Sequence, residues 1–170
     1  RQVLDPARHF APFDLENTLI ASNVVASYSW LATRPLATEG RIRQAIRILG
    51  RGPSLLAQDR RDRSDFLRHF YRRYDKAPVA QLDEGSTEMF SHLLLAKSFP
   101  AAIRRVREHR KAVHRTVLIT GALDFAIAPL RPLFDDVVCA RLDTRSDGTY
   151  RGELTEVPPT GEARASVLAD

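Results

Sequence analysis

The sequence predicts an α/β fold in which a parallel sheet is interrupted by an all-helical insertion. A short strand-like run at residues 9–15 precedes a long stretch, residues 20–95, whose apolar positions recur at helical spacing. After Pro100 helix-like and strand-like segments alternate, which is typical of a parallel sheet covered by helices. We therefore expect a discontinuous α/β core of residues 1–21 and 96–170, with a helical cap of residues 22–95 inserted into it.

The first strand and the helical insertion follow from local patterns. The strand candidate HFAPFDL contains Pro12, which cannot donate a hydrogen bond to a neighbouring strand. Turn signals with glycine or proline at 50–53 and 75–78 separate the helices of the insertion. Four apolar stripes predict these helices: Val24, Val25, Tyr28 and Leu31; Ile42, Ala45, Ile46 and Leu49; Phe66, Phe70, Tyr71 and Tyr74; and Leu82, Met89, Phe90, Leu93 and Leu94.

The segments after residue 100 predict the rest of the sheet. Residues 101–112 read as a helix with Pro100 at its start, and the apolar run 116–120 indicates a strand covered on both faces. A helix over 122–130 and a strand over 136–142 follow. Asp147 and Gly148 indicate a tight turn before a strand at 149–154, and Thr160 is suited to begin a helix over 160–168.

Composition limits the kind of protein. Of 170 residues, 44% are hydrophobic and 28% charged, which fits one globular domain, or a core with an inserted sub-domain, rather than a disordered chain. No run of 18 apolar residues is present, so we expect no transmembrane segment. The N-terminus lacks an apolar signal segment, and the single cysteine, Cys139, cannot form an internal disulfide. These features predict a cytoplasmic protein.

The net charge is +5, from 26 Lys and Arg against 21 Asp and Glu. The cations concentrate in residues 41–76 and 104–115, on helix-like segments whose solvated faces are the usual explanation. They could also attract an anionic partner such as a phosphate ester, acyl-CoA or lipid headgroup. We expect no nucleic-acid binding, because aromatic and basic residues do not interleave on an exposed strand surface.

Two polar clusters lie where an open α/β sheet places its active site, at the carboxyl ends of strands. Asp14 and Glu16 follow the first strand, and one carboxylate could attack or bind a metal while the other moves protons. Thr120, Gly121 and Ala122 follow the next core strand, and a hydroxyl with free backbone N–H groups before a helix suits an anionic oxygen. For either cluster alone, turn and helix capping is the simpler explanation.

Taken together, the segments FDLENTLI at 13–20, VLITGA at 117–122 and GEAR at 161–164 resemble three motifs of one family. The layout is similar to the haloacid dehalogenase superfamily of phosphatases and phosphotransferases, in its phosphoserine-phosphatase-like branch. The resemblance covers about residues 10–170 and implies a Rossmann-like core with a helical cap. The sequence also resembles domains attached to fatty acyl-CoA reductases and acyltransferases of actinobacteria.

The resemblance implies roles for individual residues. Asp14 would be the nucleophile that forms an aspartyl-phosphate, and Glu16 the general acid and base. Asp14 and the backbone carbonyl of Glu16 would hold Mg²⁺. Thr120, Gly121, Ala122 and Arg164 would bind the phosphate of a small phosphorylated substrate.

The sequence departs from the family pattern at four places. Glu16 stands where the family has Asp, Asn17 where it has Gly, and Arg164 where it has Lys. The fourth motif, Gly-Asp-x-x-x-Asp, is absent from residues 1–170, so we expect the third metal ligand to be missing and the core to be truncated at its C-terminus. Two functions therefore stay open. One is a Mg²⁺-dependent phosphomonoester phosphatase. The other is a catalytically impaired module with a structural or docking role beside a lipid-metabolism enzyme, an acyl-CoA reductase or acyltransferase.

Overall fold

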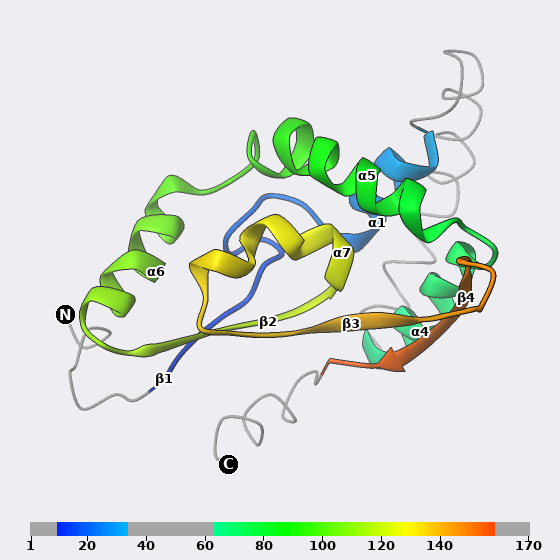
Figure 1. The fold of residues 1–170 in the computed structure, drawn as a ribbon. Helices are drawn as coiled ribbons and strands as arrows, with labels where there is room; N and C mark the ends of the chain where they lie inside the picture. Colours follow the sequence, from blue (N-terminus) through cyan, green and yellow to red (C-terminus); the bar gives the residue numbers. More distant parts are fainter. Residues whose placement is uncertain (1–9, 34–62, 159–170) are drawn as a thin grey trace.

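The computed structural model describes residues 10–33 and 63–158, and these form a sheet with helices packed against it (Figure 1). In the described part of the chain the sheet has four strands, in the order β1 (Phe10–Phe13), β2 (Arg115–Leu123), β3 (Asp136–Thr144) and β4 (Tyr150–Glu156). The pairs β1–β2 and β2–β3 are parallel, and β4 is antiparallel to β3. The predicted α/β class is confirmed.

Strand β1 accommodates its proline because it lies at an edge of the described sheet. Pro12 is paired in register with Val117 of β2. An edge strand needs hydrogen bonds on one side only, so a residue without an N–H group is tolerated there. The strand predicted at residues 9–15 is confirmed, with shorter bounds than expected.

Helices are the main elements of the described segment between β1 and α6 (Pro100–Lys111). It contains α1 (Val24–Thr33), α4 (Arg63–Tyr71), the 3₁₀ turn η2 (Arg72–Tyr74), α5 (Val79–Met89) and the π-helical turn η3 (Phe90–Leu94). Three of the four predicted stripes are confirmed, and the stripe at 42–49 lies outside the described residues. The division into a core and a separate cap domain stays a prediction.

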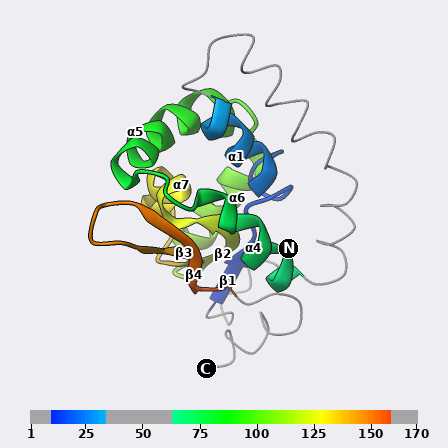
Figure 2. The same ribbon diagram turned by 90° about the vertical axis from the view of Figure 1, so that its right-hand side faces the viewer.

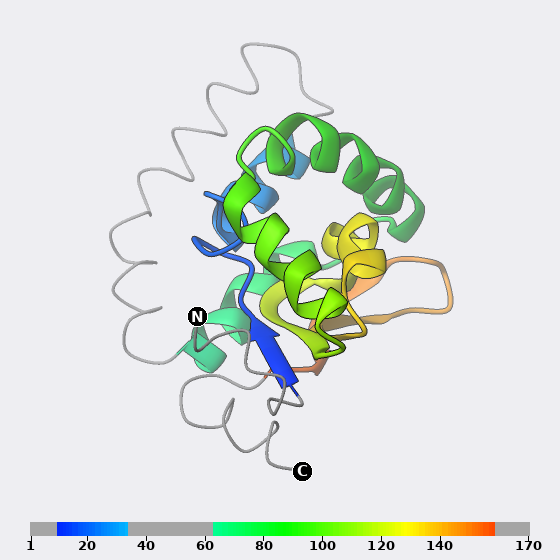
Figure 3. The same ribbon diagram turned by 90° about the vertical axis from the view of Figure 1, so that its left-hand side faces the viewer.

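The remaining helices cover the sheet. Helix α6 (Pro100–Lys111) lies over β2 (Figure 3) and begins with a proline, which suits a first helical position because its missing N–H would have no partner there. The short α7 (Asp124–Ile127) and the 3₁₀ helix η4 (Ala128–Leu133) connect β2 to β3. Helix α5 packs over α7 (Figures 1 and 2).

The hairpin of β3 and β4 ties the helical segment to the sheet. Its turn has Gly148 at a φ of 79°, as the predicted Asp-Gly turn requires. The N–H of Tyr150 donates to Ala77 O at 3.0 Å, and the N–H of Lys76 donates to Tyr150 O at 2.8 Å. Arg145 Nη2 also lies 2.6 Å from Asp75 Oδ1. Backbone and ionic contacts therefore anchor the η2–α5 connection to the hairpin.

One hydrophobic cluster joins these layers. It includes Leu19 from the loop after β1, Phe70 from α4, Val106 from α6 and Leu118 from β2, each no more than 1% exposed. The loop that carries Asp14 is thus held in place by Leu15 and Leu19, which both belong to this cluster. Among the described residues, no helix combines the length and the apolar character that crossing a membrane would require.

Candidate functional site

The loop after β1 is a compact turn closed by its own backbone. Leu15 O accepts hydrogen bonds from Leu19 N at 3.0 Å and Ile20 N at 3.1 Å, and Asn17 N donates to Ile20 O at 2.7 Å. Leu15 and Leu19 are buried at 2% and 0% exposure, so both ends of the turn are fastened in the core. Asn17 has a φ of 58°, a left-handed conformation that asparagine adopts more readily than most residues. Asparagine therefore fits where the family motif has glycine.

The turn leaves its two carboxylates partly buried at the end of β1. Asp14 follows Phe13 directly, and its Oδ1 accepts a hydrogen bond from Leu15 N at 2.8 Å. Glu16 is two residues further along the same turn and is also partly buried. The local fold thus holds Asp14 and Glu16 at the carboxyl end of a parallel strand, as predicted.

Residues 120–122 form a bulge inside β2 rather than the end of a strand. Ile119 is opposite Val138 and Leu123 is opposite Ala140, so four residue steps along β2 correspond to two along β3. Bulges of this kind re-aim side chains and are common beside active sites.

The predicted strand end at Thr120 and the predicted helix start at Ala122 are therefore wrong. Strand β2 continues to Leu123, and α7 begins at Asp124. The physical reason is burial: all residues from 116 to 123 are buried. The backbone of the bulge consequently stays extended between β1, β3 and the helices, and Gly121 and Ala122 do not open a helix.

The structure brings the bulge and the loop after β1 together. Thr120 is fully buried, and its Oγ1 donates to Glu16 Oε2 at 3.3 Å across a separation of 104 residues. Ala122 N donates to the same Oγ1 at 3.0 Å. Glu16, Thr120 and Ala122 therefore form one connected group of polar atoms beside Asp14.

Tyr71 lies next to this group, although its spacing in the sequence predicted only a place in an apolar helical stripe. Its hydroxyl donates to Gly121 O at 2.6 Å, and the residue is 2% exposed. A buried tyrosine hydroxyl usually requires a hydrogen-bond partner, so a tyrosine inside a buried stripe was a signal for such a contact. Its partner could not be identified from the sequence, because 50 residues separate the two.

Arg164 and the helix predicted at 160–168 lie outside the described residues. The role expected for Arg164 at the site stays a prediction.

The donor atoms at the site suit a hard cation. Mg²⁺ binds oxygen ligands and in phosphate-handling sites often uses one or two carboxylates together with substrate oxygens and water. The Asp14 carboxylate and the Glu16 carbonyl belong to this class of donor. Within residues 10–33 and 63–158, no group of three or more His, Cys, Asp or Glu side chains could hold a metal ion by itself. A Mg²⁺ site at Asp14 and Glu16 stays a prediction.

Acidic groups gather between α5 and α7, next to the bulge. Asp124 opens α7, and its Oδ1 accepts a hydrogen bond from Phe125 N at 2.8 Å. Burial, together with the nearby Asp124 carboxylate, raises the pKa of Asp83 on α5. Burial, with the Asp124 and Asp83 carboxylates, raises the pKa of Tyr150 to about 12. Tyr150 is therefore a neutral packing residue at physiological pH.

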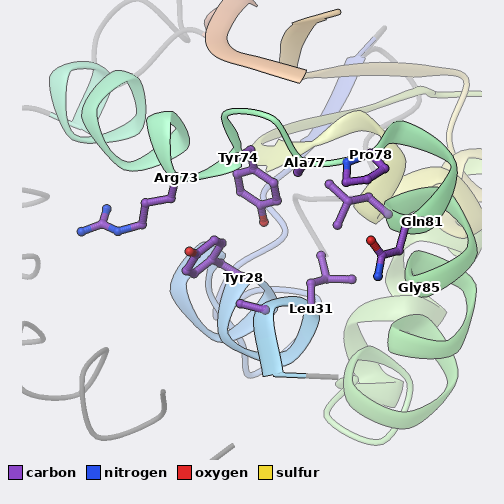
Figure 4. Close-up of a pocket in the computed structure, with 10 residues that line it drawn as sticks. Tyr28, Leu31, Arg73, Tyr74, Ala77, Pro78, Gln81 and Gly85 are labelled. Atoms are coloured by element: carbon purple, nitrogen blue, oxygen red, sulfur yellow. The ribbon is translucent and has the colours of Figure 1, made fainter. Parts of the chain in front are cut away.

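A cavity of about 460 Å³ lies between α1, η2 and α5 (Figure 4). The rings of Tyr28 and Tyr74 line it, with centroids 5.2 Å apart, and Leu31 and Leu82 add apolar surface. Its volume is in the range of small-molecule pockets. None of the predicted site residues is among its described lining residues, so it is separate from the group around Thr120.

The chain matches one known protein family over most of its length. The model of the haloacid dehalogenase-like hydrolase family matches residues 11–170. A histidinol-phosphatase of Neisseria meningitidis serogroup C (strain 8013) is 25% identical over 173 residues, covering 95% of this chain and 72% of that protein.

Two solved structures illustrate the likeness of the fold. A protein of unknown function from Bordetella pertussis Tohama I has a TM-score of 0.75 and 19% identity, over 95% of this chain and 72% of that chain. A phosphoserine phosphatase in its apo form has a TM-score of 0.62 and 13% identity, over 95% of this chain and 68% of that chain. At these identities the structures support the fold alone.

Proposed function

Because the chain belongs to the haloacid dehalogenase-like hydrolase family, we propose that it is a phosphatase that hydrolyses small phosphomonoesters. The family match and the relative named histidinol-phosphatase support this activity. The name of that relative also supports a small, polar phosphorylated substrate.

The single observation that carries the proposal is the 3.3 Å contact between Thr120 Oγ1 and Glu16 Oε2. It joins a hydroxyl suited to phosphoryl oxygens with a carboxylate suited to proton transfer. Asp14 lies in the same turn as Glu16, two residues before it. The residues proposed as nucleophile, proton donor and anion-binding hydroxyl therefore come together where the carboxyl end of β1 lies beside the bulge in β2.

The reaction would proceed in two steps. First, an Asp14 carboxylate oxygen attacks phosphorus, the bond from phosphorus to the ester oxygen breaks, and a protonated Glu16 gives its proton to the leaving alcohol. Second, Glu16 takes a proton from water, the water oxygen attacks phosphorus, and the bond from phosphorus to Asp14 breaks. The net change is one phosphomonoester and one water consumed, with one alcohol and one inorganic phosphate released.

The anion-binding part of the site would stabilise charge on the transferring group. Thr120 Oγ1 and the N–H groups of Gly121 and Ala122 would donate to phosphoryl oxygens. The guanidinium of Arg164 would neutralise the charge of the phosphate and of Asp14. When bound by the Asp14 carboxylate and the Glu16 carbonyl, Mg²⁺ would add positive charge beside the phosphoryl oxygens.

A thermal-shift experiment with beryllofluoride and Mg²⁺ tests the proposal without a guess at the substrate. Beryllofluoride mimics an aspartyl-phosphate, so we expect a Mg²⁺-dependent rise in melting temperature for the wild type. Asp14→Asn should abolish the rise. The matched control is Glu153→Gln. Glu153 is an exposed residue of β4 whose carboxylate makes no ion pair in the described part of the chain, so this variant should keep the rise in melting temperature. Absence of any rise in the wild type would refute the proposal.

A structural or docking role is the second candidate, and the identity of residue 16 favours it. Glutamate is longer than aspartate by one carbon–carbon bond, about 1.5 Å. A misplacement of about 1 Å can cost ~10²-fold in rate. If the wild type binds no beryllofluoride, this fold would lack the chemistry of its family, and a partner, such as a lipid-metabolism enzyme, becomes the object of the search.

A further inference from the structure

We propose that Tyr71 is a positioning residue whose hydroxyl orients the Gly121–Ala122 peptide for anion binding. The inference rests on the proposed function and adds to it a residue from the helical segment. It follows from one buried hydrogen bond, from the geometry of the peptide group, and from the bulge in β2.

The hydrogen bond joins two parts of the fold that are distant in sequence. Tyr71 is the last residue of α4, and Gly121 lies in the middle of the bulge. The distance from Tyr71 Oη to Gly121 O is 2.6 Å, and Tyr71 is 2% exposed. Water therefore has little access to compete for this carbonyl, and the contact holds its direction.

A peptide group is planar and trans, so its carbonyl and its N–H point in opposite directions. Fixing Gly121 O toward α4 consequently fixes Ala122 N–H toward the other side. On that side the N–H donates to Thr120 Oγ1 at 3.0 Å. The peptide is thus held at both ends, with its donor beside the hydroxyl proposed to bind phosphate. Donation into the carbonyl also polarises the N–H and strengthens it as a donor.

Because of the bulge, the Gly121–Ala122 peptide needs a hydrogen bond from outside the sheet to fix its orientation. Between Ile119 and Leu123 the pairing of β2 with β3 changes register. Residues inside a bulge leave the regular ladder, so their peptides are not oriented by a neighbouring strand in the usual way. Tyr71 supplies the missing restraint from α4.

The role of the hydroxyl can be separated from the role of the ring. The ring packs against Phe70 and Tyr74, with centroid distances of 5.7 and 5.8 Å. A phenylalanine at position 71 would keep these ring contacts and lose the hydrogen bond to Gly121 O. Tyr74 offers a matched control, because its hydroxyl points into the separate cavity (Figure 4) and makes no hydrogen bond within residues 10–33 and 63–158.

The test compares the wild type with Tyr71→Phe and Tyr74→Phe in two assays. The first is the dissociation constant of beryllofluoride with Mg²⁺ by calorimetry, and the second is kcat and KM with p-nitrophenyl phosphate. We expect Tyr71→Phe to weaken beryllofluoride binding about 10-fold and to lower kcat by a similar factor, with KM changed less. This is below the ~10²–10³-fold loss typical when an oxyanion donor is removed outright. Tyr74→Phe should stay within about twofold of the wild type.

A second measurement uses the wild type alone and does not depend on the variant folding. The amide proton resonance of Ala122, followed by NMR, should move when beryllofluoride and Mg²⁺ are added. A resonance that does not respond would overturn the inference, because the oriented N–H would not meet the anion.

The outcomes separate this inference from the proposed function. If the wild type binds beryllofluoride and Tyr71→Phe binds it equally well, the inference fails and the proposed function stands. If Tyr71→Phe lowers only the melting temperature and leaves affinity and kcat unchanged, Tyr71 is purely structural and the inference also fails. A wild type that does not bind beryllofluoride refutes the proposed function, and this inference with it.

Discussion

Thr120→Val removes one hydroxyl from a fully buried position and nearly preserves the shape of the side chain. In the wild type that hydroxyl accepts from Ala122 N at 3.0 Å and donates to Glu16 Oε2 at 3.3 Å. Valine leaves both groups without this contact, the Ala122 N–H in a buried strand and the Glu16 carboxylate in a partly buried turn. We expect a loss of stability and a loss of anion binding from the same substitution.

The magnitude follows from the two hydrogen bonds. A bond to a neutral backbone group contributes about 1 kcal/mol, and a long bond to a carboxylate about 1.5 kcal/mol. The free energy of unfolding should therefore fall by about 2.5 kcal/mol. For a chain of this length each kcal/mol corresponds to about 2–4 °C, so the melting temperature should fall by roughly 5–10 °C.

Thr120→Ser is the matched control, because serine keeps the hydroxyl and loses a methyl group. Its cost should be about 1 kcal/mol. Urea unfolding and calorimetry measure both variants, and the beryllofluoride thermal shift measures the anion site. We expect the shift to survive in Thr120→Ser and to vanish in Thr120→Val. The reasoning would be refuted if valine costs no more stability than serine, or if Thr120→Val still binds beryllofluoride as the wild type does.

Two further predictions concern stability away from the site. Gly152→Ala should lower the free energy of unfolding by about 3 kcal/mol, because a Cβ there would lie 3.0 Å from Arg72 Cα and O and the φ is +71°. Gly148→Ala, with a φ of +79° but open space around it, should cost only about 1 kcal/mol, and equal costs in urea unfolding would contradict this. Asp135 Oδ2 accepts hydrogen bonds from Thr116 N and Oγ1, both at 2.8 Å, and the Thr116 N–H is the main cause that lowers the pKa of Asp135. Because the pKa is lower in the folded state, this stabilisation is complete above the unfolded pKa of about 4 and is lost as the pH falls through the folded value. Asp135→Asn should therefore lower the free energy of unfolding by about 1 kcal/mol at pH 7, a value that allows for the solvent exposure of Asp135. The difference in this free energy between the variant and the wild type should shrink below about pH 4. A difference that is constant down to pH 3 would contradict the assignment.

The sequence by itself determined the fold class and the local part of the site. Apolar spacing predicted the helices α1, α4 and α5, because burial on one face leaves a periodic trace in the chain. The unbroken apolar run at 116–120 predicted β2, because a strand buried on both faces has no polar alternation. The sequence also predicted that Asp14 and Glu16 follow the first strand, and the hydrogen bonds of the turn that holds them connect residues that are neighbours in sequence.

The tertiary structure alone decided how the second half of the candidate site is built. From sequence, β2 was expected to end at Thr120 and a helix to start at Ala122, but β3 and the surrounding helices bury residues 116–123 and extend the strand to Leu123. The partners of Thr120 and Gly121 lie 104 and 50 residues away. Local propensity carries no record of contacts across such distances, because they form only when separately predictable elements pack together and bring one buried hydroxyl within reach of one buried acceptor.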